Sequence, residues 1–321
     1  MVERWKGLVG GTYLAPYGLL YDQVLTVSGF DLLTPESGVQ KGNALGELVA
    51  DAFLWAVKNL EAEAPDVPTV TVTADGVLRA PLYPGEITTS MAFDVLSMGV
   101  GSDGASGFPL VAVYLTGKEL KAAAEVDASV TPLMPAAQLY FSGVKYRFNT
   151  HRMFFNRVYE AWLSEAPFVN GFTATGLAEI DDSALYRVVT GMYSAQMLGT
   201  VRGKSMGLLS LEPKMADGAP VADVGTCILR DENGSEIKEW YALAAYLRSF
   251  GEDGVPGRYA QPDGRKAVSR SWNPVELVKN ANWITVLVLL VLAAAVVAAV
   301  FLTRALIYAH RRRRYGKKKN L

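Results

Sequence analysis

Residues 43–60 read NALGELVADAFLWAVKNL, and this stretch indicates most directly how the chain folds. Asn43 comes just before the apolar positions and belongs to the residue types that favour a helix N-cap. Apolar side chains recur at the i, i+3, i+4 spacing of one helical face, at Leu45, Leu48, Val49, Ala52, Phe53, Ala56, Val57 and Leu60. The stretch therefore predicts a helix with a buried face that ends before Pro65 and Pro68.

Helical and extended patterns alternate on the C-terminal side of this helix. Strands are predicted at 69–73, 111–115, 143–148 and 186–190. Helices are predicted at 116–126, where Thr116 and Glu119 have the spacing of a capping box, and at 237–250. We therefore expect an α+β fold in which helices pack on a mixed sheet.

Residues 283–302 form a run of twenty positions without a charged side chain. As a helix rising about 1.5 Å per residue, this run spans roughly 30 Å, which is the hydrocarbon thickness of a bilayer. Trp283 and Tyr308 lie where interfacial aromatic residues are enriched, and basic residues follow. A transmembrane helix at 281–304 and a basic cytoplasmic tail at 305–321 are therefore expected. The alternative is a buried core helix with a nucleic-acid-binding tail, but such a helix normally has a polar face.

The positive-inside rule places everything before this helix outside the cytoplasm, in a single-pass protein of the cell membrane. Residues 1–22 contain no apolar stretch of the length that a secretory signal needs. We therefore expect the chain to be the downstream part of a longer exported polypeptide. The alternative is that the N-terminal domain stays in the cytoplasm against the charge rule.

Composition is compatible with an exterior globular domain. Of the 31 Lys and Arg residues, 8 follow Thr303, whereas none of the 32 acidic residues does. The preceding part is thus acidic, and no nucleic-acid partner is expected. Cys227 is the single cysteine, so no disulfide framework can form within the chain.

The expected domain organisation follows from these patterns. Residues 251–280 are rich in Gly, Pro, Asp and Arg and lack an apolar period, which predicts a linker before the membrane helix. A globular domain is expected at 36–250, after an N-terminal segment at 1–35.

Several motifs, taken in order, resemble those of the C-terminal domain of the 5′-nucleotidase family. The helix motif at its start is similar to Asn43–Ala52. The family's Asn-x-Gly-Gly-Ile-Arg and Pro/Ala-Gly-Asp-Ile-Thr motifs are similar to Ala74–Arg79 and Pro84–Thr88, its Leu-Thr-Gly-x-x-Leu and Val-Ser-Gly-Leu-x-Tyr motifs to Leu115–Leu120 and Phe141–Tyr146, and a later strand to Tyr186–Thr190. Together the matches cover about residues 40 to 200.

The resemblance implies a domain that holds the nucleoside part of a nucleotide, while a preceding metallophosphatase domain holds two metals and cleaves the phosphate. A two-metal centre needs several His, Asp and Asn ligands, and this chain has only His151 and His310 as histidines. We therefore expect no catalytic residue, metal site or cofactor in this chain and no activity from it alone. Divalent metals are expected only in a metallophosphatase domain or chain that acts as its partner.

The resemblance also implies a nucleotide- or nucleoside-binding site. The substrate-binding candidates are Asp75, Gly76, Arg79, Tyr140, Phe141 and Tyr193. Arg79 takes the place of the motif arginine that reaches the ligand, although it could also be a surface arginine paired with Glu86 or another acid. The three aromatic residues could clamp a base between their faces, although aromatic residues at strand spacing more often belong to the core.

Two functions of different classes follow from these expectations. The first is the substrate-binding part of a membrane-anchored 5′-nucleotidase in nucleotide catabolism, with nucleotide as ligand. The second is a non-catalytic cell-surface interaction module whose nucleotide recognition has degenerated.

Overall fold

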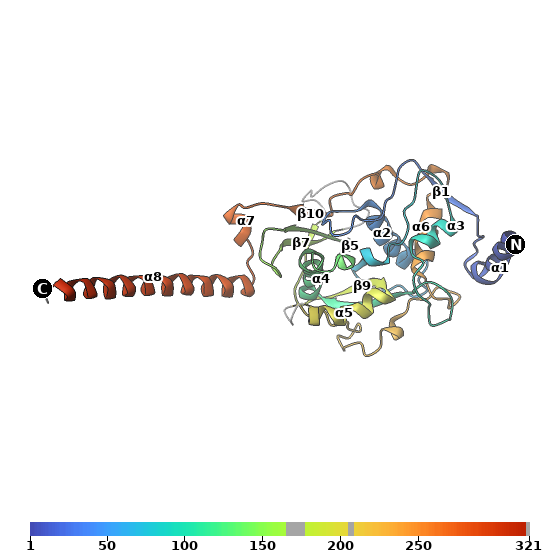
Figure 1. Cartoon of the computed structure of the whole chain (residues 1–321). Coiled ribbons are helices and arrows are strands. Elements are labelled where there is room, and N and C mark those ends of the chain that lie inside the picture. Colours follow the sequence, from blue (N-terminus) through green and yellow to red (C-terminus); the bar gives the residue numbers. More distant parts are fainter. Residues whose placement is uncertain (165–176, 205–208, 319–321) are drawn as a thin grey trace. The chain divides into compact units, whose positions relative to one another are not determined.

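The computed structural model describes residues 1–164, 177–204 and 209–318. They divide into two units, Met1–Ser271 and Trp272–Leu321 (Figure 1).

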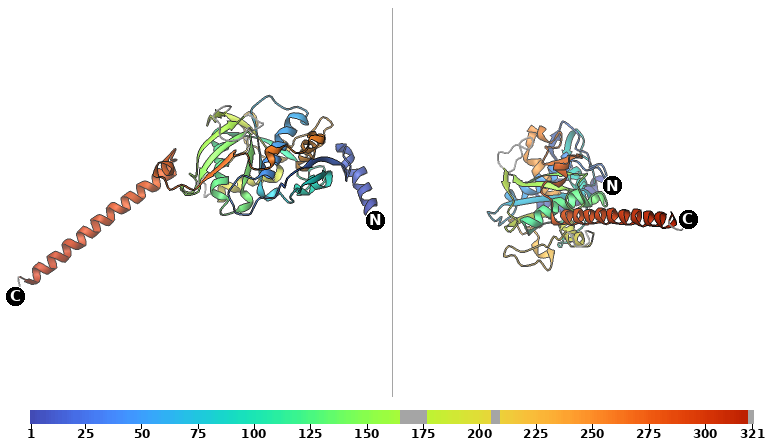
Figure 2. Two further views of the ribbon diagram at one scale, coloured as in Figure 1. Left: turned by 90° about the horizontal axis from the view of Figure 1, so that it is seen from above. Right: turned by 90° about the vertical axis from the view of Figure 1, so that its left-hand side faces the viewer.

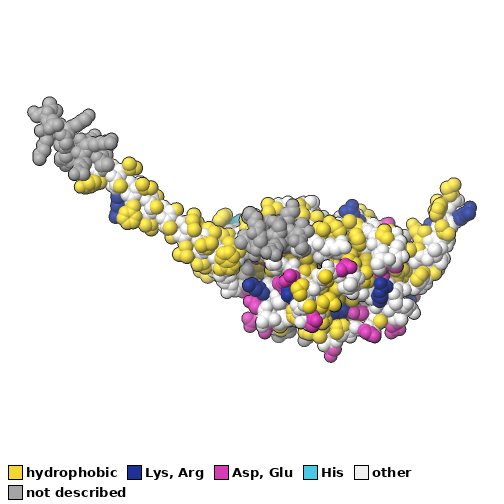
Figure 3. All heavy atoms as spheres, turned by 90° about the horizontal axis from the view of Figure 1, so that it is seen from below, with side chains coloured by type: hydrophobic (Ala, Val, Ile, Leu, Met, Phe, Trp, Pro, Cys, Tyr) yellow, Lys and Arg dark blue, Asp and Glu magenta, His cyan; other side chains and the backbone are white. Residues whose placement is uncertain are grey.

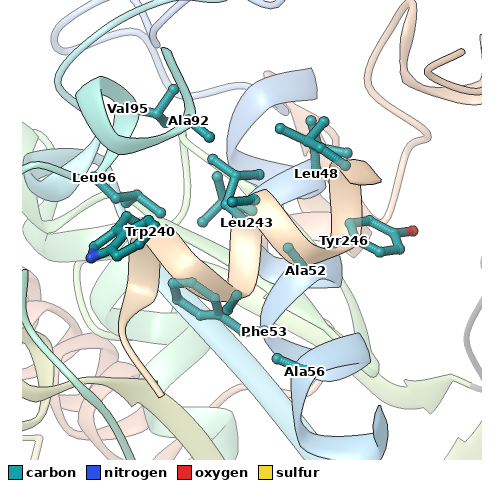
Figure 4. Close-up of a cluster of buried hydrophobic side chains, with 14 of the residues drawn as sticks. Leu48, Ala52, Phe53, Ala56, Ala92, Val95, Leu96, Trp240, Leu243 and Tyr246 are labelled. Atoms are coloured by element: carbon teal, nitrogen blue, oxygen red, sulfur yellow. The ribbon is translucent and has the colours of Figure 1, made fainter. Parts of the chain in front are cut away.

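Helix α2 (Ala44–Asn59) lies at the centre of the first unit and confirms the helix predicted at 43–60. The side chain of Asn43 caps it by accepting a hydrogen bond of 2.8 Å from the backbone N–H of Gly46. Helix α2 is buried on more than the expected face, because α6 (Glu239–Ser249) packs against it in addition to three strands. Figure 4 shows Phe53 of α2 beside Trp240 and Leu243 of α6 in this core.

The first sheet has four strands in the order β4-β9-β2-β5. Their bounds are Leu110–Thr116 for β4, Leu185–Gly191 for β9, Thr69–Ala74 for β2 and Leu139–Ser142 for β5. Strand β2 runs parallel to β9, whereas the other two pairs are antiparallel, so the sheet is mixed as expected.

The second sheet also has four strands, in the order β10-β6-β7-β8. Their bounds are Lys266–Ser269 for β10, Val144–Asn149 for β6, Val158–Ser164 for β7 and Leu177–Glu179 for β8. Helix α4 (Gly117–Val130) packs against strands of both sheets. It begins with the predicted capping box, in which Thr116 and Glu119 each bond the other's backbone N–H.

The other α-helices and strands of the first unit lie outside these layers, with α1 at its N-terminal end (Figure 2). Strands β1 and β3 form a two-stranded antiparallel sheet. The bounds are Val2–Val9 for α1, Thr89–Val95 for α3, Met192–Lys204 for α5, Val24–Ser28 for β1 and Gly85–Thr88 for β3.

The first unit extends beyond the domain boundaries expected from the sequence. On the N-terminal side, Leu14, Leu25 and Leu32 are buried in the main core. On the C-terminal side, part of the expected linker forms β10, which pairs with β6. This stretch shows no apolar pattern in the sequence because its buried side chains are charged. They are buried as ion pairs, such as the pair of Arg265 with Asp51.

The second unit contains α7 (Pro274–Val278) and the long helix α8 (Trp283–Lys318). The part Trp283–Tyr308 has a mean hydropathy of 3.1 and is long and apolar enough to cross a membrane. Its visible face carries mainly hydrophobic side chains (Figure 3).

Candidate functional site

One edge of the first sheet brings together several of the candidate residues. Strands β2 and β9 are parallel, with Thr71 opposite Val189, so their C-terminal ends meet there. Strands β4 and β5 are antiparallel to them and begin at the same edge. We call this region the sheet edge; it consists of residues 74–79, 108–110, 138–139 and 191–193. Asp75, Gly76 and Arg79 therefore share one edge with Tyr193, although they are more than a hundred positions apart in the chain.

Asp75 and Gly76 form a fixed turn directly after β2. The backbone N–H of Asp75 donates to the carbonyl of Gln138 at 2.7 Å, and the N–H of Leu78 donates back to the carbonyl of Asp75 at 3.0 Å. A side chain at Gly76 would lie 3.0 Å from the Cβ of Ala136, so glycine permits the close approach of these two segments. Burial raises the pKa of the half-buried Asp75, although the nearby Lys266 opposes the effect.

Arg79 lies on the surface at the sheet edge. Its backbone N–H donates to the carbonyl of Val95 at 2.8 Å, which fixes the start of the side chain. Across the described ranges, its guanidinium makes no ion pair, and the pair with Glu86 that the sequence left open is not formed. The cation is therefore available to an anionic ligand.

Tyr140 and Phe141 lie in the core rather than at the surface, with at most 2% of either residue exposed. The ring of Tyr140 packs against the backbone at Gly46, and its hydroxyl accepts a hydrogen bond of 2.8 Å from the Gln138 amide. Phe141 meets Tyr146 edge to face with ring centroids 5.5 Å apart. Neither ring is open to a ligand in this structure.

Tyr193 is partly exposed and stacks on Phe108, which sequence reasoning did not identify as a candidate. The ring centroids are 5.9 Å apart and the planes differ by 25°. This spacing is that of two rings in direct contact, so no base lies between them. The available signal for Phe108 was its place between the glycine-rich stretch 101–107 and a predicted strand.

The glycine-rich stretch 101–107 is closed over an ion cluster. The ammonium group of the fully buried Lys238 lies 2.7 Å from an oxygen of Asp103 and 2.6 Å from an oxygen of Glu236. Ser102 also donates to Glu236. The cation is neutralised by two acids, so this stretch does not form a phosphate cradle in the described structure.

Glu239 is a buried carboxyl group beside the sheet edge. Its backbone N–H donates to the carbonyl of Phe108 at 2.9 Å, and its side chain occupies the space that a Cβ at Gly191 would take. Within the described ranges, neither carboxyl oxygen has a hydrogen-bond partner. Burial raises the pKa of Glu239 to about 8, so the group holds its proton at neutral pH.

No group of three or more His, Cys, Asp and Glu side chains suited to a metal ion occurs in the part of the chain that the structure describes. The sheet edge instead offers one exposed cation, a partly exposed aromatic ring and backbone groups. These groups can hold a ligand that has an anionic part and a flat ring.

Comparisons with known proteins agree with this architecture. The model of the family described as 5′-nucleotidase, C-terminal domain, matches residues 24–200. The crystal structure of a 5′-nucleotidase precursor from Thermus thermophilus is similar with a TM-score of 0.56 and 26% identity, over 81% of this chain and 42% of that chain. The NAD nucleotidase of Haemophilus influenzae gives a TM-score of 0.49 and 15% identity, over 84% of this chain and 42% of that one. No curated protein matches the sequence. The chain thus spans about two fifths of the length of these structures.

Proposed function

Because the chain belongs to the family of 5′-nucleotidase C-terminal domains, we propose that it binds the nucleotide or nucleoside in a 5′-nucleotidase-type phosphohydrolase of nucleotide catabolism. The observation that carries the proposal is the sheet edge. There Arg79, in the motif that resembles the family's arginine motif, is an exposed cation without an acidic partner among the described residues, and Tyr193 supplies an aromatic face. Both groups have the chemistry that a nucleotide presents in its phosphate and its base.

The candidate residues divide into two roles in this proposal. Arg79 donates charge-assisted hydrogen bonds to an anionic or hydroxyl oxygen of the ligand, and each such bond contributes about 1.5 to 3 kcal/mol. The turn at Asp75 and Gly76 positions the arginine and offers polar groups to the ligand. Tyr193 stacks on the base, whereas Tyr140 and Phe141 support the sheet edge from the core.

We assign the hydrolysis itself to a metallophosphatase domain in a longer polypeptide or in a second chain, where two divalent metals would activate water. This chain covers 42% of the similar structure from Thermus thermophilus, so the part of that protein that it leaves uncovered is long enough to contain such a domain. The activity of the whole protein therefore requires the two parts to act on one nucleotide.

The proposal also places the chain in the cell membrane. Helix α8 would cross the bilayer once, because its apolar part matches the hydrocarbon thickness and carries no charge from Trp283 to Leu302. The basic residues at 311–319 favour a cytoplasmic C-terminus and an extracytoplasmic first unit.

A second candidate function is a non-catalytic cell-surface module with a degenerate nucleotide site. It is favoured by the burial of Tyr140 and Phe141 and by the direct contact between Phe108 and Tyr193, since these features leave no preformed slot for a base.

A calorimetric titration of the full chain in detergent with adenosine and AMP tests the proposal. We expect saturable binding that Arg79→Ala weakens roughly 10- to 150-fold, as the loss of about 1.5 to 3 kcal/mol requires. Arg270→Ala is the matched control, because Arg270 is also exposed but follows β10. No binding up to millimolar ligand would favour the interaction module, and equal affinities of the wild type and Arg79→Ala would remove Arg79 from the site.

A further inference from the structure

The segment just before α8 carries an unusual set of exposed apolar side chains. The four residues, which we call the juxtamembrane cluster, are Trp272, Val275, Val278 and Trp283, and they are between 51% and 72% exposed. All four lie within twelve consecutive positions of the second unit. Water-exposed apolar side chains that gather in this way commonly mark an interaction surface.

The cluster is held in a defined local structure. Val275 and Val278 are three positions apart on α7, so their side chains lie on one side of this short helix. The side chain of Asn273 caps α7 by accepting a hydrogen bond of 3.0 Å from the N–H of Val275. The N–H of Ala281 then donates to the carbonyl of Val278 at 3.2 Å, which closes the turn between the two helices.

The same turn keeps α7 close to the start of α8. Four residues, 279–282, separate the helices, and Asn282 caps α8 by accepting from the N–H of Thr285 at 3.1 Å. Five residues, each extending the chain by at most about 3.6 Å, limit the separation of Val278 from Trp283 to roughly 18 Å. If the hydrocarbon region begins near Trp283, this short connection lets α7 lie in the headgroup layer, which is about 5 to 8 Å thick on each side.

We propose that the juxtamembrane cluster is a second membrane-binding element, which inserts its two tryptophans and two valines into the interfacial layer of the bilayer. The proposal rests on the membrane-spanning role of α8 given above and adds the lipid interface as a partner of α7. Tryptophan is enriched at this depth because its ring is apolar while its N–H can bond to headgroups and water.

Two observations favour lipid over a protein partner. The exposed apolar surface of the cluster continues along the chain into the exposed apolar surface of α8, which lipid already accounts for in the proposed function. Residues 272–283 also carry one acid, Glu276, and one base, Lys279, so their net charge is zero. The segment therefore gains no net-charge attraction to anionic lipid, and its binding to the interface depends on its apolar side chains.

Site-specific fluorescence of the full chain in phosphatidylcholine nanodiscs tests this inference. In a Cys227→Ser background, an environment-sensitive probe is attached to a single cysteine in the variants Val275→Cys and Val278→Cys. Ala294→Cys reports on the middle of α8, and Ala216→Cys, which is exposed in the first unit, is the matched control. Lipids with a nitroxide near the headgroup end of the acyl chain quench a probe that lies in the interface.

We expect quenching and a blue-shifted emission at 275 and 278, together with neither effect at 216. Adding Trp272→Asp should reduce the quenching at 275 several-fold if the cluster inserts as a unit.

A different result would contradict the inference. If lipids with a nitroxide deep in the bilayer quench the probe at 294, but no lipid quenches the probes at 275 and 278, the inference is overturned while the anchor stays in place. A blue shift at 275 and 278 without lipid quenching would also overturn it, since protein would then cover the cluster. No quenching at 294 would refute the anchor and this inference with it.

Discussion

Glu239 illustrates how a single side chain can make the fold sensitive to pH. Its carboxyl group is buried at the start of α6 without a hydrogen-bond partner in the described ranges, and burial raises its pKa to about 8 from the ordinary glutamate value of 4.5. Between these two values the native state holds a proton that the unfolded state releases. Raising the pH therefore favours unfolding, by at most about 1.4 kcal/mol for each pH unit.

We predict that Glu239→Gln removes this contribution, because glutamine has nearly the same shape and stays neutral. The free energy of unfolding, measured by urea denaturation from pH 5 to 8, should fall less steeply with pH in the variant than in the wild type. Burial also raises the pKa of Glu47 to about 8 and that of Glu125 to about 7, so some slope remains. The exposed Glu232→Gln is the control. Parallel pH curves for Glu239→Gln and the wild type would contradict the assigned pKa.

Among the candidate site residues, position was easier to predict than orientation. The motif that contains Asp75, Gly76 and Arg79 shows a turn after a strand in the sequence itself, and the structure has that turn. Whether Tyr140 faces a ligand or the core depends on which elements cover β5, and no local pattern contains that information. Phe108 contacts Tyr193 only because β4 pairs with β9, so this contact could not be read from either segment alone.

At the scale of elements, the packing of α2 on β5 depends on Gly46. The ring of Tyr140 lies directly over this glycine, where a Cβ would overlap its atoms. The glycine of the helix motif therefore permits a close approach of helix and strand. Gly46 lies in the first turn of α2, and glycine in a helix costs up to about 1 kcal/mol of helix propensity relative to alanine, which the close packing offsets.

We predict that Gly46→Ala destabilises the first unit by about 1 to 3 kcal/mol, because overpacking against a buried ring outweighs the gain in helix propensity. The shift in urea midpoint measures the effect. Gly7→Ala is the matched control, since Gly7 also lies in a helix but has no atom within 4 Å of the added Cβ. That control should be neutral or slightly stabilising, and a stabilising Gly46→Ala would show that α2 moves away from Tyr140 at little cost.

Strand β10 shows why some elements were missed from the sequence. Its neighbour Arg265 is fully paired in the interior, with oxygens of Asp51 at 2.6 and 3.0 Å and of Asp263 at 2.7 Å. Lys266 is likewise buried against Asp127 at 2.8 Å. Charged residues in a stretch with glycine and proline are typical of a solvated linker, and their burial here depends on two distant partners, Asp51 of α2 and Asp127 of α4. Those partners lie more than a hundred positions away in the sequence.

At the scale of the whole molecule, the two units differ in how much of their structure can be predicted from the sequence alone. Helix α8 follows from an uninterrupted apolar run, a property that needs no knowledge of other segments. The α+β class and four of the ten described strands of the first unit, β2, β4, β6 and β9, were also predicted, because their periodicities are local. The N-terminal extent of the first unit was not predicted, because Leu14, Leu25 and Leu32 enter the core from a stretch without regular periodicity.

We predict that the wild-type chain stays in the membrane pellet after alkaline extraction, whereas Leu292→Arg with Val296→Arg does not. Each arginine near the centre of a spanning helix costs about 2.5 to 3.5 kcal/mol on insertion scales, so the pair opposes insertion by roughly 5 to 7 kcal/mol. Ala216→Arg with Ala219→Arg adds the same charge at exposed positions of the first unit and serves as the control. This control should remain in the pellet, because its added charges lie on the exposed surface of the first unit and not on α8. Release of the wild-type chain into the supernatant at alkaline pH would contradict the anchor. Alkali opens membranes into sheets and weakens charge contacts, so it releases chains that are held only at the membrane surface.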